Sequence, residues 1–109
     1  ENNRFRSEMY LRRSQAKYKR VINSDAPTGP FWARRELISA LKDIERSLHL
    51  SRENLIEILY SRAHIFYHLR RFQEALRDVK TLSRFQPDSF ITPGIVHDLK
   101  LIIVKACKD

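Results

Sequence analysis

Apolar residues recur three and four positions apart along most of the chain, and this spacing constrains the fold more than any other feature. The clearest series has steps of four, three and four residues and consists of Leu37, Leu41, Ile44 and Leu48. Because an α-helix completes a turn every 3.6 residues, such a series forms one apolar stripe along a helix face. Two glycines and four prolines in 109 residues are too few to separate the strands of a large sheet. The sequence therefore predicts an all-α fold.

Turn-forming residues divide the chain into five predicted helices. The longest connection is the loop of residues 23–30, where two prolines and a glycine prevent a helix from continuing. The shortest is Arg70-Arg71, which requires the helices on either side to pack antiparallel. Ser51 and Thr92 are the expected N-caps of the third and fifth helices, because a hydroxyl there accepts a free backbone amide. The five helices are expected at about residues 5–22, 31–50, 52–69, 72–85 and 93–107.

Each predicted helix carries one apolar face, and we expect these faces to meet in a single core. In the fifth helix Leu101 and Val104 lie off that face. Besides the series given above, the expected core residues are Leu11, Tyr18, Val21, Ile22, Leu55, Leu59, Ala63, Phe66, Phe72, Ala75, Leu76, Val79, Leu82, Ile95, Val96, Leu99, Ile102, Ile103 and Ala106.

The segment from Leu59 to Asp88 resembles a tetratricopeptide repeat, a 34-residue helix–turn–helix unit. In the first helix the pattern has a large apolar residue, a small residue four later and an aromatic residue three later. It continues with an aromatic residue at the turn, an alanine three later and a proline twelve after that. Arg62 and Leu82 depart from the leucine and alanine usual at their positions. The six matching residues are Leu59, Ala63, Phe66, Phe72, Ala75 and Pro87.

The resemblance implies one domain spanning residues 1–109, with about two repeats and a C-terminal helix that caps them. Ala40, Ile44 and Ser47 resemble the second helix of an earlier repeat. The implied parts are a degenerate first repeat at 5–50, interrupted by the loop at 23–30, the best-matching repeat at 52–88, and the capping helix at 92–107.

In this family the first helices of successive repeats line a concave groove that receives a peptide or a helix of another protein. The resemblance therefore implies a protein-interaction domain, an adaptor or scaffold, whose partner offers acidic and apolar side chains. Arg12, Ala16 and Ser61 stand where members that bind chaperone tails have a lysine and two asparagines, which disfavours that ligand. Carried over by helical register, the partner-binding residues are Arg12, Arg13, Lys19 and Arg20 on the first helix and Tyr60, Ser61, His64, Tyr67 and His68 on the third.

Two alternative functions follow from other features. The net charge is +8, and residues 1–22 hold seven basic residues against Glu1 and Glu8. Basic residues interleaved with Tyr10 and Tyr18 favour a helical domain that binds nucleic acid through its first helix, contacting phosphates and stacking bases. A tyrosine-lined groove is also similar to the peptide-substrate-binding domain of collagen prolyl hydroxylases, which implies a domain of a larger enzyme.

The sequence carries no pattern typical of catalysis or of a cofactor. His64 and His68 are one helical turn apart, but residue 65 is an isoleucine and no third ligand is evident, so we expect no metal site. The sequence has no glycine-rich phosphate loop and no GxSxG motif. We therefore expect that the chain is not an enzyme and has no small-molecule substrate. Cys107 is the single cysteine. A single cysteine fits a reducing compartment, and no apolar run is long enough to span a membrane. The sequence therefore predicts an intracellular protein, cytoplasmic or nuclear.

Overall fold

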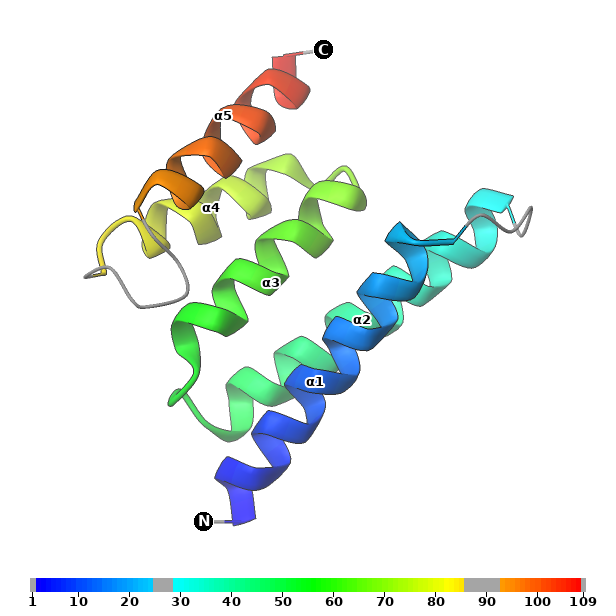
Figure 1. Ribbon diagram of the computed structural model, residues 1–109, viewed down its shortest axis with the longest axis vertical. Helices are drawn as coiled ribbons and strands as arrows, with labels where there is room; N and C mark the ends of the chain where they lie inside the picture. The colour runs from blue at the N-terminus through cyan, green and yellow to red at the C-terminus, as the bar shows by residue number, and fades with distance from the viewer. Residues whose placement is uncertain (1, 25–28, 86–92, 109) are drawn as a thin grey trace.

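Five α-helices make up almost all of the part of the chain that can be described. The computed structural model describes residues 2–24, 29–85 and 93–108, and 87% of these are helical, with no strand among them. The predicted all-α fold is confirmed. The helices are α1 (Asn2–Ile22), α2 (Gly29–Leu50), α3 (Leu55–His68), α4 (Phe72–Leu82) and α5 (Pro93–Lys108), as Figure 1 shows.

The helices pack mainly as neighbours in sequence. α1 lies antiparallel along α2, and α4 folds back along α3 and is covered on its other side by α5 (Figure 1). α2 also contacts α3, and this contact joins the α1–α2 pair to the remaining three helices. α1 touches α3 as well, so these two helices, far apart in the sequence, lie next to one another.

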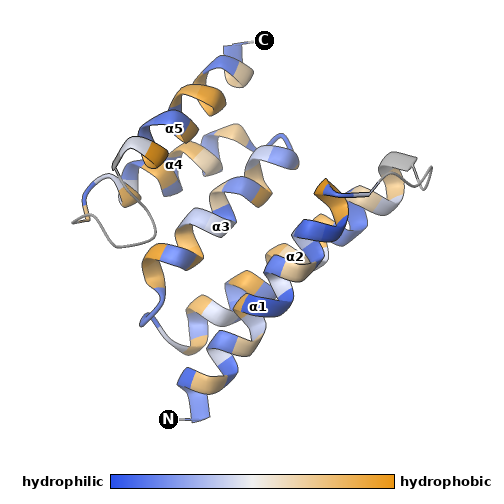
Figure 2. Ribbon diagram, viewed as in Figure 1, coloured by the Kyte–Doolittle hydropathy of each residue, from blue (hydrophilic) through white to orange (hydrophobic). Residues whose placement is uncertain are grey.

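A single core runs through all five helices. Most of the predicted apolar faces are confirmed, and Leu11, Ile44, Ala63 and Val79 are completely buried. Ile58 and Ile65 are also buried although they lie off the predicted stripe, because α3 sits between α2 and α4 and is covered on more than one side. α1, by contrast, is coloured mostly hydrophilic in Figure 2 and buries only Ser7, Leu11 and Ser14.

The prediction of buried side chains was wrong at three isoleucines. Ile22 at the end of α1 is 46% exposed, and Ile95 and Ile102 of α5 are 40% and 49% exposed. Among the described residues α5 packs mainly against α4, so only a narrow stripe of it is covered, formed by Val96, Leu99 and Ile103. The sequence shows which residues of a helix are apolar, but it does not show how many partner helices cover them. For this reason the predicted buried face of α5 was too broad.

Small polar residues, rather than large apolar ones, form much of the contact between α1 and α2. The Ser7 hydroxyl donates to the backbone oxygen of Ser47 at 2.7 Å, and the Ser47 hydroxyl donates to the backbone oxygen of Ser7 at the same distance. Further along, the Ser14 hydroxyl donates to the backbone oxygen of Ala40 at 2.8 Å. All four residues are buried. Side chains this small allow two helix backbones to approach closely, and each hydroxyl finds its hydrogen-bond acceptor on the backbone of the opposite helix.

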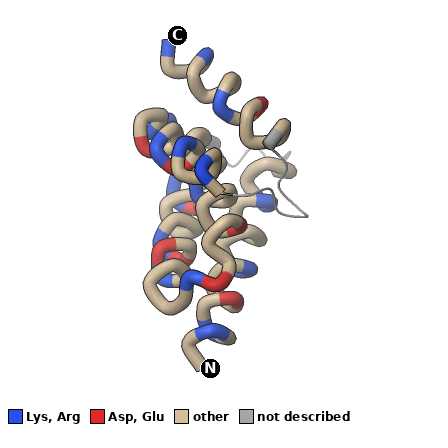
Figure 3. Tube along the Cα trace, turned by 90° about the vertical axis from the view of Figure 1, so that its left-hand side faces the viewer, with Lys and Arg blue, Asp and Glu red and all other residues tan. Residues whose placement is uncertain are grey.

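Both helix pairs are clamped by the same kind of ion pair. In α1–α2, Nε and a terminal nitrogen of Arg13 donate to the two carboxylate oxygens of Asp43 at 2.9 and 2.7 Å. In α3–α4, Arg62 donates in the same way to Asp78 at 2.8 and 2.7 Å. Lys17 adds a third contact to Asp43 at 2.8 Å. Figure 3 shows acidic residues interleaved with basic ones over much of the molecule, as this pairing requires.

The ends of α3 differ in part from expectation. Ser51 does not cap the helix, because α3 begins only at Leu55, and Asn54 at the N-cap position makes no capping hydrogen bond with its side chain. The Ser51 hydroxyl instead accepts the amide of Glu53 at 3.2 Å within the turn that separates α2 from α3. At the other end the short connection is confirmed: Arg70 has φ 62°, and this left-handed residue reverses the chain. Thr92, the other expected cap, and the loop residues 25–28 lie outside the described residues.

Candidate interaction groove between α1 and α3

The contact between α1 and α3 leaves a groove on one side of the molecule, which we call the α1–α3 groove. Its volume is about 500 Å³, and a narrower recess of about 180 Å³ continues from it between the helices toward His64 and Ile65. The recess has Tyr18 on one wall and Tyr60 on the other. The groove is lined by Arg12, Gln15, Tyr18, Lys19, Glu57, Tyr60 and Ser61.

A hydrogen-bonded network forms the polar end of the groove. Arg12 donates to Glu57 at 2.5 Å and to Gln15 at 2.9 Å, and it lies 3.5 Å from Glu8 on its own helix. The Gln15 amide donates to Glu57 at 2.8 Å and to the Ser61 hydroxyl at 3.2 Å. Arg12, Gln15, Glu57 and Ser61 therefore each have a hydrogen-bond partner inside the protein, and the Arg12 charge is compensated by two carboxylates.

The other end of the groove is aromatic. The ring centroids of Tyr60 and His64 are 4.7 Å apart in an edge-to-face arrangement. The Tyr18 ring lies 5.9 Å from His64 and 5.4 Å from His68, and its hydroxyl is 3.5 Å from Nδ1 of His64. Edge-to-face and tilted pairs at such distances are favourable contacts between rings. These rings make the walls of the recess flat, largely apolar and already ordered.

Burial shifts the titration of the groove residues. It raises the pKa of Tyr18 to about 12, with a further contribution from Tyr60 and Tyr67, and it raises the pKa of Tyr60. Burial lowers the pKa of His64, and the neighbouring His68 lowers it further. At Glu57 burial acts to raise the pKa, but the hydrogen bonds from Gln15 and Arg12 outweigh it, and the pKa lies below its ordinary value. At neutral pH the recess is uncharged, whereas Glu57 is ionised.

We expect the free energy of unfolding to fall as the pH drops from about 7 to about 5. The pKa of His64 and that of His68 lie below the ordinary value of 6.5, so the unfolded chain binds protons more readily over this range. The contribution of the two imidazoles is complete above pH 6.5 and is lost as the pH falls through their folded-state values. Urea unfolding at several pH values measures this, and His64→Gln/His68→Gln should flatten the profile. An equally steep profile in the double variant would contradict the assignment.

The structure brings five of the nine predicted partner-binding residues to the groove and its recess, namely Arg12, Lys19, Tyr60, Ser61 and His64. His68 lies beside them in contact with Tyr18, at the end of α3. The other three lie elsewhere, each for a reason in its contacts.

Arg13 and Arg20 do not line the groove as expected. They point to α2, where Arg13 is held by Asp43 and Arg20 by Glu36 at 2.5 Å. Tyr67 does not line the groove either, and its ring lies between those of His68 and Phe72, at centroid distances of 5.1 and 5.9 Å. Ion pairs with Asp43 and Glu36 of α2 therefore keep the two arginines outside the groove.

Sequence reasoning missed Gln15 and Tyr18 as groove residues. Arg12, Gln15 and Lys19 are separated by three and four positions and so share a helix face, which is the signal that would have found Gln15. Tyr18 was assigned to the core, and it does pack against the core while its ring also lines the groove. A ring at the boundary between core and surface can do both, and spacing cannot separate the two.

The described residues form neither a metal site nor a membrane-spanning helix. In this part of the chain no three His, Cys, Asp or Glu side chains gather closely enough to bind a metal ion. None of the five helices, over their described residues, combines the length and apolar character that crossing a membrane requires. Comparisons with protein-family models, with curated proteins and with solved structures return no match.

Proposed function

We propose that this chain is a protein-interaction module built from two tetratricopeptide-like helix pairs, and that its α1–α3 groove binds a segment of a partner protein. The observation that carries the proposal is the groove itself. It lies between the first helices of two successive pairs, where this class of repeat binds peptides, and it joins an aromatic recess to an exposed lysine, Lys19.

The equivalence of the two helix pairs supports the repeat architecture. Arg13 directly precedes the buried Ser14 as Arg62 precedes the buried Ala63, and both arginines clasp an aspartate of the following helix in the same geometry. Each aspartate follows a buried alanine by three positions, Ala40 in one pair and Ala75 in the other. The two residues of the ion pair are 30 positions apart in the first helix pair and 16 in the second, mainly because α1 and α2 extend further beyond the ion pair than α3 and α4 do.

The contacts of the groove refine the ligand that the sequence suggests. Arg12 is held by Glu57 and Glu8 and offers little to an acidic side chain. Lys19 has no carboxylate partner within the described ranges and remains the cation available at the groove. We therefore expect a segment that places one apolar or aromatic side chain between Tyr18 and Tyr60 and one carboxylate near Lys19. A peptide-binding domain of a larger enzyme would use the same groove.

Peptides selected from a random display library on the purified chain test this proposal by calorimetry. Tyr60→Ala should weaken binding by about 1–2 kcal/mol, as removal of an aromatic anchor does. Lys19→Ala should mainly slow association and reduce its dependence on salt, because a charge at the rim steers more than it holds.

Two matched variants serve as controls. Tyr10→Ala removes a tyrosine of α1 that does not line the groove, and Lys100→Ala removes an exposed lysine of α5. Both should bind the selected peptides as the unmodified chain does. Full-strength binding by Tyr60→Ala/Lys19→Ala, or an equal loss in the controls, would place the binding surface elsewhere.

A further inference from the structure

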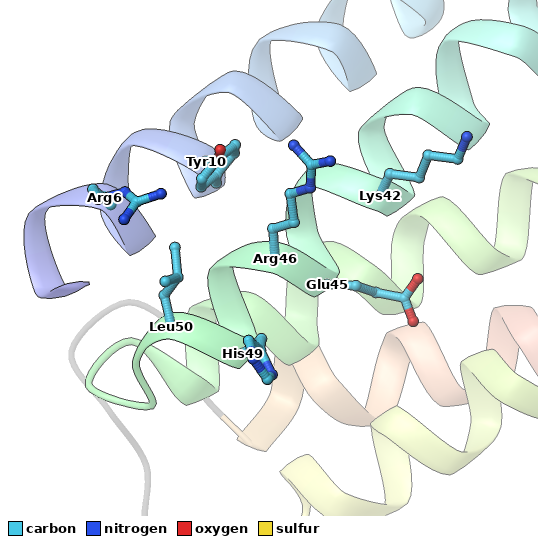
Figure 4. Close-up of a pocket in the computed structure, with 7 residues that line it drawn as sticks. All are labelled: Arg6, Tyr10, Lys42, Glu45, Arg46, His49 and Leu50. Atoms are coloured by element: carbon cyan, nitrogen blue, oxygen red, sulfur yellow. The ribbon is translucent and has the colours of Figure 1, made fainter.

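A second hollow lies between α1 and α2 and shares no residue with the α1–α3 groove. Its volume is about 570 Å³, in the range of pockets that hold small ligands. Arg6 and Tyr10 come from α1, and the other lining residues come from the C-terminal half of α2 (Figure 4). We call it the α1–α2 basic pocket, lined by Arg6, Tyr10, Lys42, Glu45, Arg46, His49 and Leu50.

The cations of this pocket are not neutralised by the protein. Arg6, Lys42 and Arg46 form no ion pair with any described carboxylate, although Arg12, Arg13, Arg20 and Arg62 all do. Glu45 is the one carboxylate on the lining, and its side chain points away from Tyr10 in Figure 4. Its charge acts instead on Arg62 and Arg71 of the neighbouring helix pair. The pocket therefore presents uncompensated positive charge to solvent.

Tyr10 provides a flat surface at the centre of this charge. The guanidinium carbon of Arg13 lies 5.1 Å from the centre of its ring and that of Arg46 lies 5.7 Å from it. Arg13 is fixed in place by Asp43, whereas Arg46 forms no ion pair with any residue that the structure describes. Tyr10 is partly exposed and is not part of the hydrophobic core. A planar ligand can thus stack on the Arg46 guanidinium, or replace it over the Tyr10 ring, without breaking an ion pair or a core contact.

We infer that the α1–α2 basic pocket binds single-stranded nucleic acid, with phosphates on Arg6, Lys42 and Arg46 and a base stacked at Tyr10. Nucleic-acid strands combine regularly spaced negative charges with flat rings, and this pocket combines free cations with a half-exposed aromatic ring. An acidic peptide would satisfy the cations and leave the ring unused. Of the basic residues in 1–22 that the sequence suggested for nucleic acid, Arg6 lines this pocket beside Tyr10. Arg12, Arg13 and Arg20 are not involved, because carboxylates of this chain hold them.

Fluorescence anisotropy with labelled strands of about twelve thymidines or uridines tests this inference. The affinity should fall with a logarithmic salt slope of about −2, since three phosphates are neutralised on a single strand. Lys42→Ala/Arg46→Ala should weaken binding at least tenfold and make the slope shallower. Tyr10→Leu should weaken it about fivefold or more with the slope unchanged, because stacking is lost and charge is not. Arg46→Lys separates the charge from the planar group and should fall between these variants.

The matched control is Lys80→Ala/Arg84→Ala, which removes the same charge from exposed positions outside the pocket. This control, and the groove variant Tyr60→Ala, should bind the strands normally, so failure of the groove proposal leaves this result unaffected. Thermal unfolding by circular dichroism checks that each variant is folded. No binding at about 50 mM salt, equal losses in the control, or full-strength binding by Tyr10→Leu would overturn the inference. So would equally tight, Lys42- and Arg46-dependent binding of a glutamate oligomer, which would make the ligand an acidic peptide.

Discussion

Asp78→Ala is expected to lower the free energy of unfolding by about 2–4 kcal/mol. Removing one partner of a buried ion pair leaves the other charge without compensation, which costs roughly 3–5 kcal/mol when burial is complete. The Asp78 side chain is 5% exposed and that of Arg62 is 19% exposed. Because Arg62 keeps some contact with water after its partner is gone, the expected loss is somewhat smaller than for a completely buried pair. Urea unfolding followed by circular dichroism measures it.

A double variant distinguishes the loss of the pair from the loss of packing. Arg62→Leu/Asp78→Ala removes both charges and places at position 62 the leucine usual in tetratricopeptide repeats, so it should recover most of the lost stability. The exposed pair of Arg71 and Glu74 provides the comparison, since its side chains are 46% and 36% exposed. Glu74→Ala should change stability by less than about 1 kcal/mol. If Asp78→Ala lost no more stability than Glu74→Ala, the ion pair of Arg62 and Asp78 would not be what holds α3 to α4.

Ser47→Leu is expected to cost about 2–3 kcal/mol or more, while Ser47→Ala costs at most about 1 kcal/mol. Ser47 is fully buried against Ser7, which is 1% exposed, and each hydroxyl is bonded to the opposite backbone. Leucine overpacks this contact, which alone costs about 1–3 kcal/mol, and forces α1 away from α2. Alanine keeps the close approach, and the Ser7 hydroxyl retains its acceptor on the backbone of residue 47.

Leu82 makes this comparison informative, because it occupies in α4 the position that Ser47 occupies in α2. Leu82→Ala should be destabilising, as truncation of a buried leucine is. A larger side chain should therefore lower stability at position 47, whereas a smaller one should lower it at position 82. Melting temperatures of Ser47→Leu, Ser47→Ala and Leu82→Ala measure this difference. Tolerance of leucine at position 47 would mean that the two helices of the first pair do not approach closely.

The all-α fold and most of the core could be predicted because helix formation and amphipathic patterning are local. The series Leu37, Leu41, Ile44 and Leu48 requires no partner to be recognised as one helix face, and all four residues lie in or against the core. The short connection before α4 likewise follows from the two residues that form it. Each of these conclusions depends on residues within a few helical turns of one another.

Only the tertiary structure decided which face of α1 lines the groove. Apolar spacing orients a helix where its stripe is broad, but α1 buries one large side chain, Leu11, between two serines. Its remaining face is assigned by contacts with residues far away in sequence, 30 positions for Arg13 with Asp43 and 45 for Arg12 with Glu57. Charged side chains at adjacent positions look alike in the sequence, and the carboxylate that each one reaches determines whether it faces α2 or the groove.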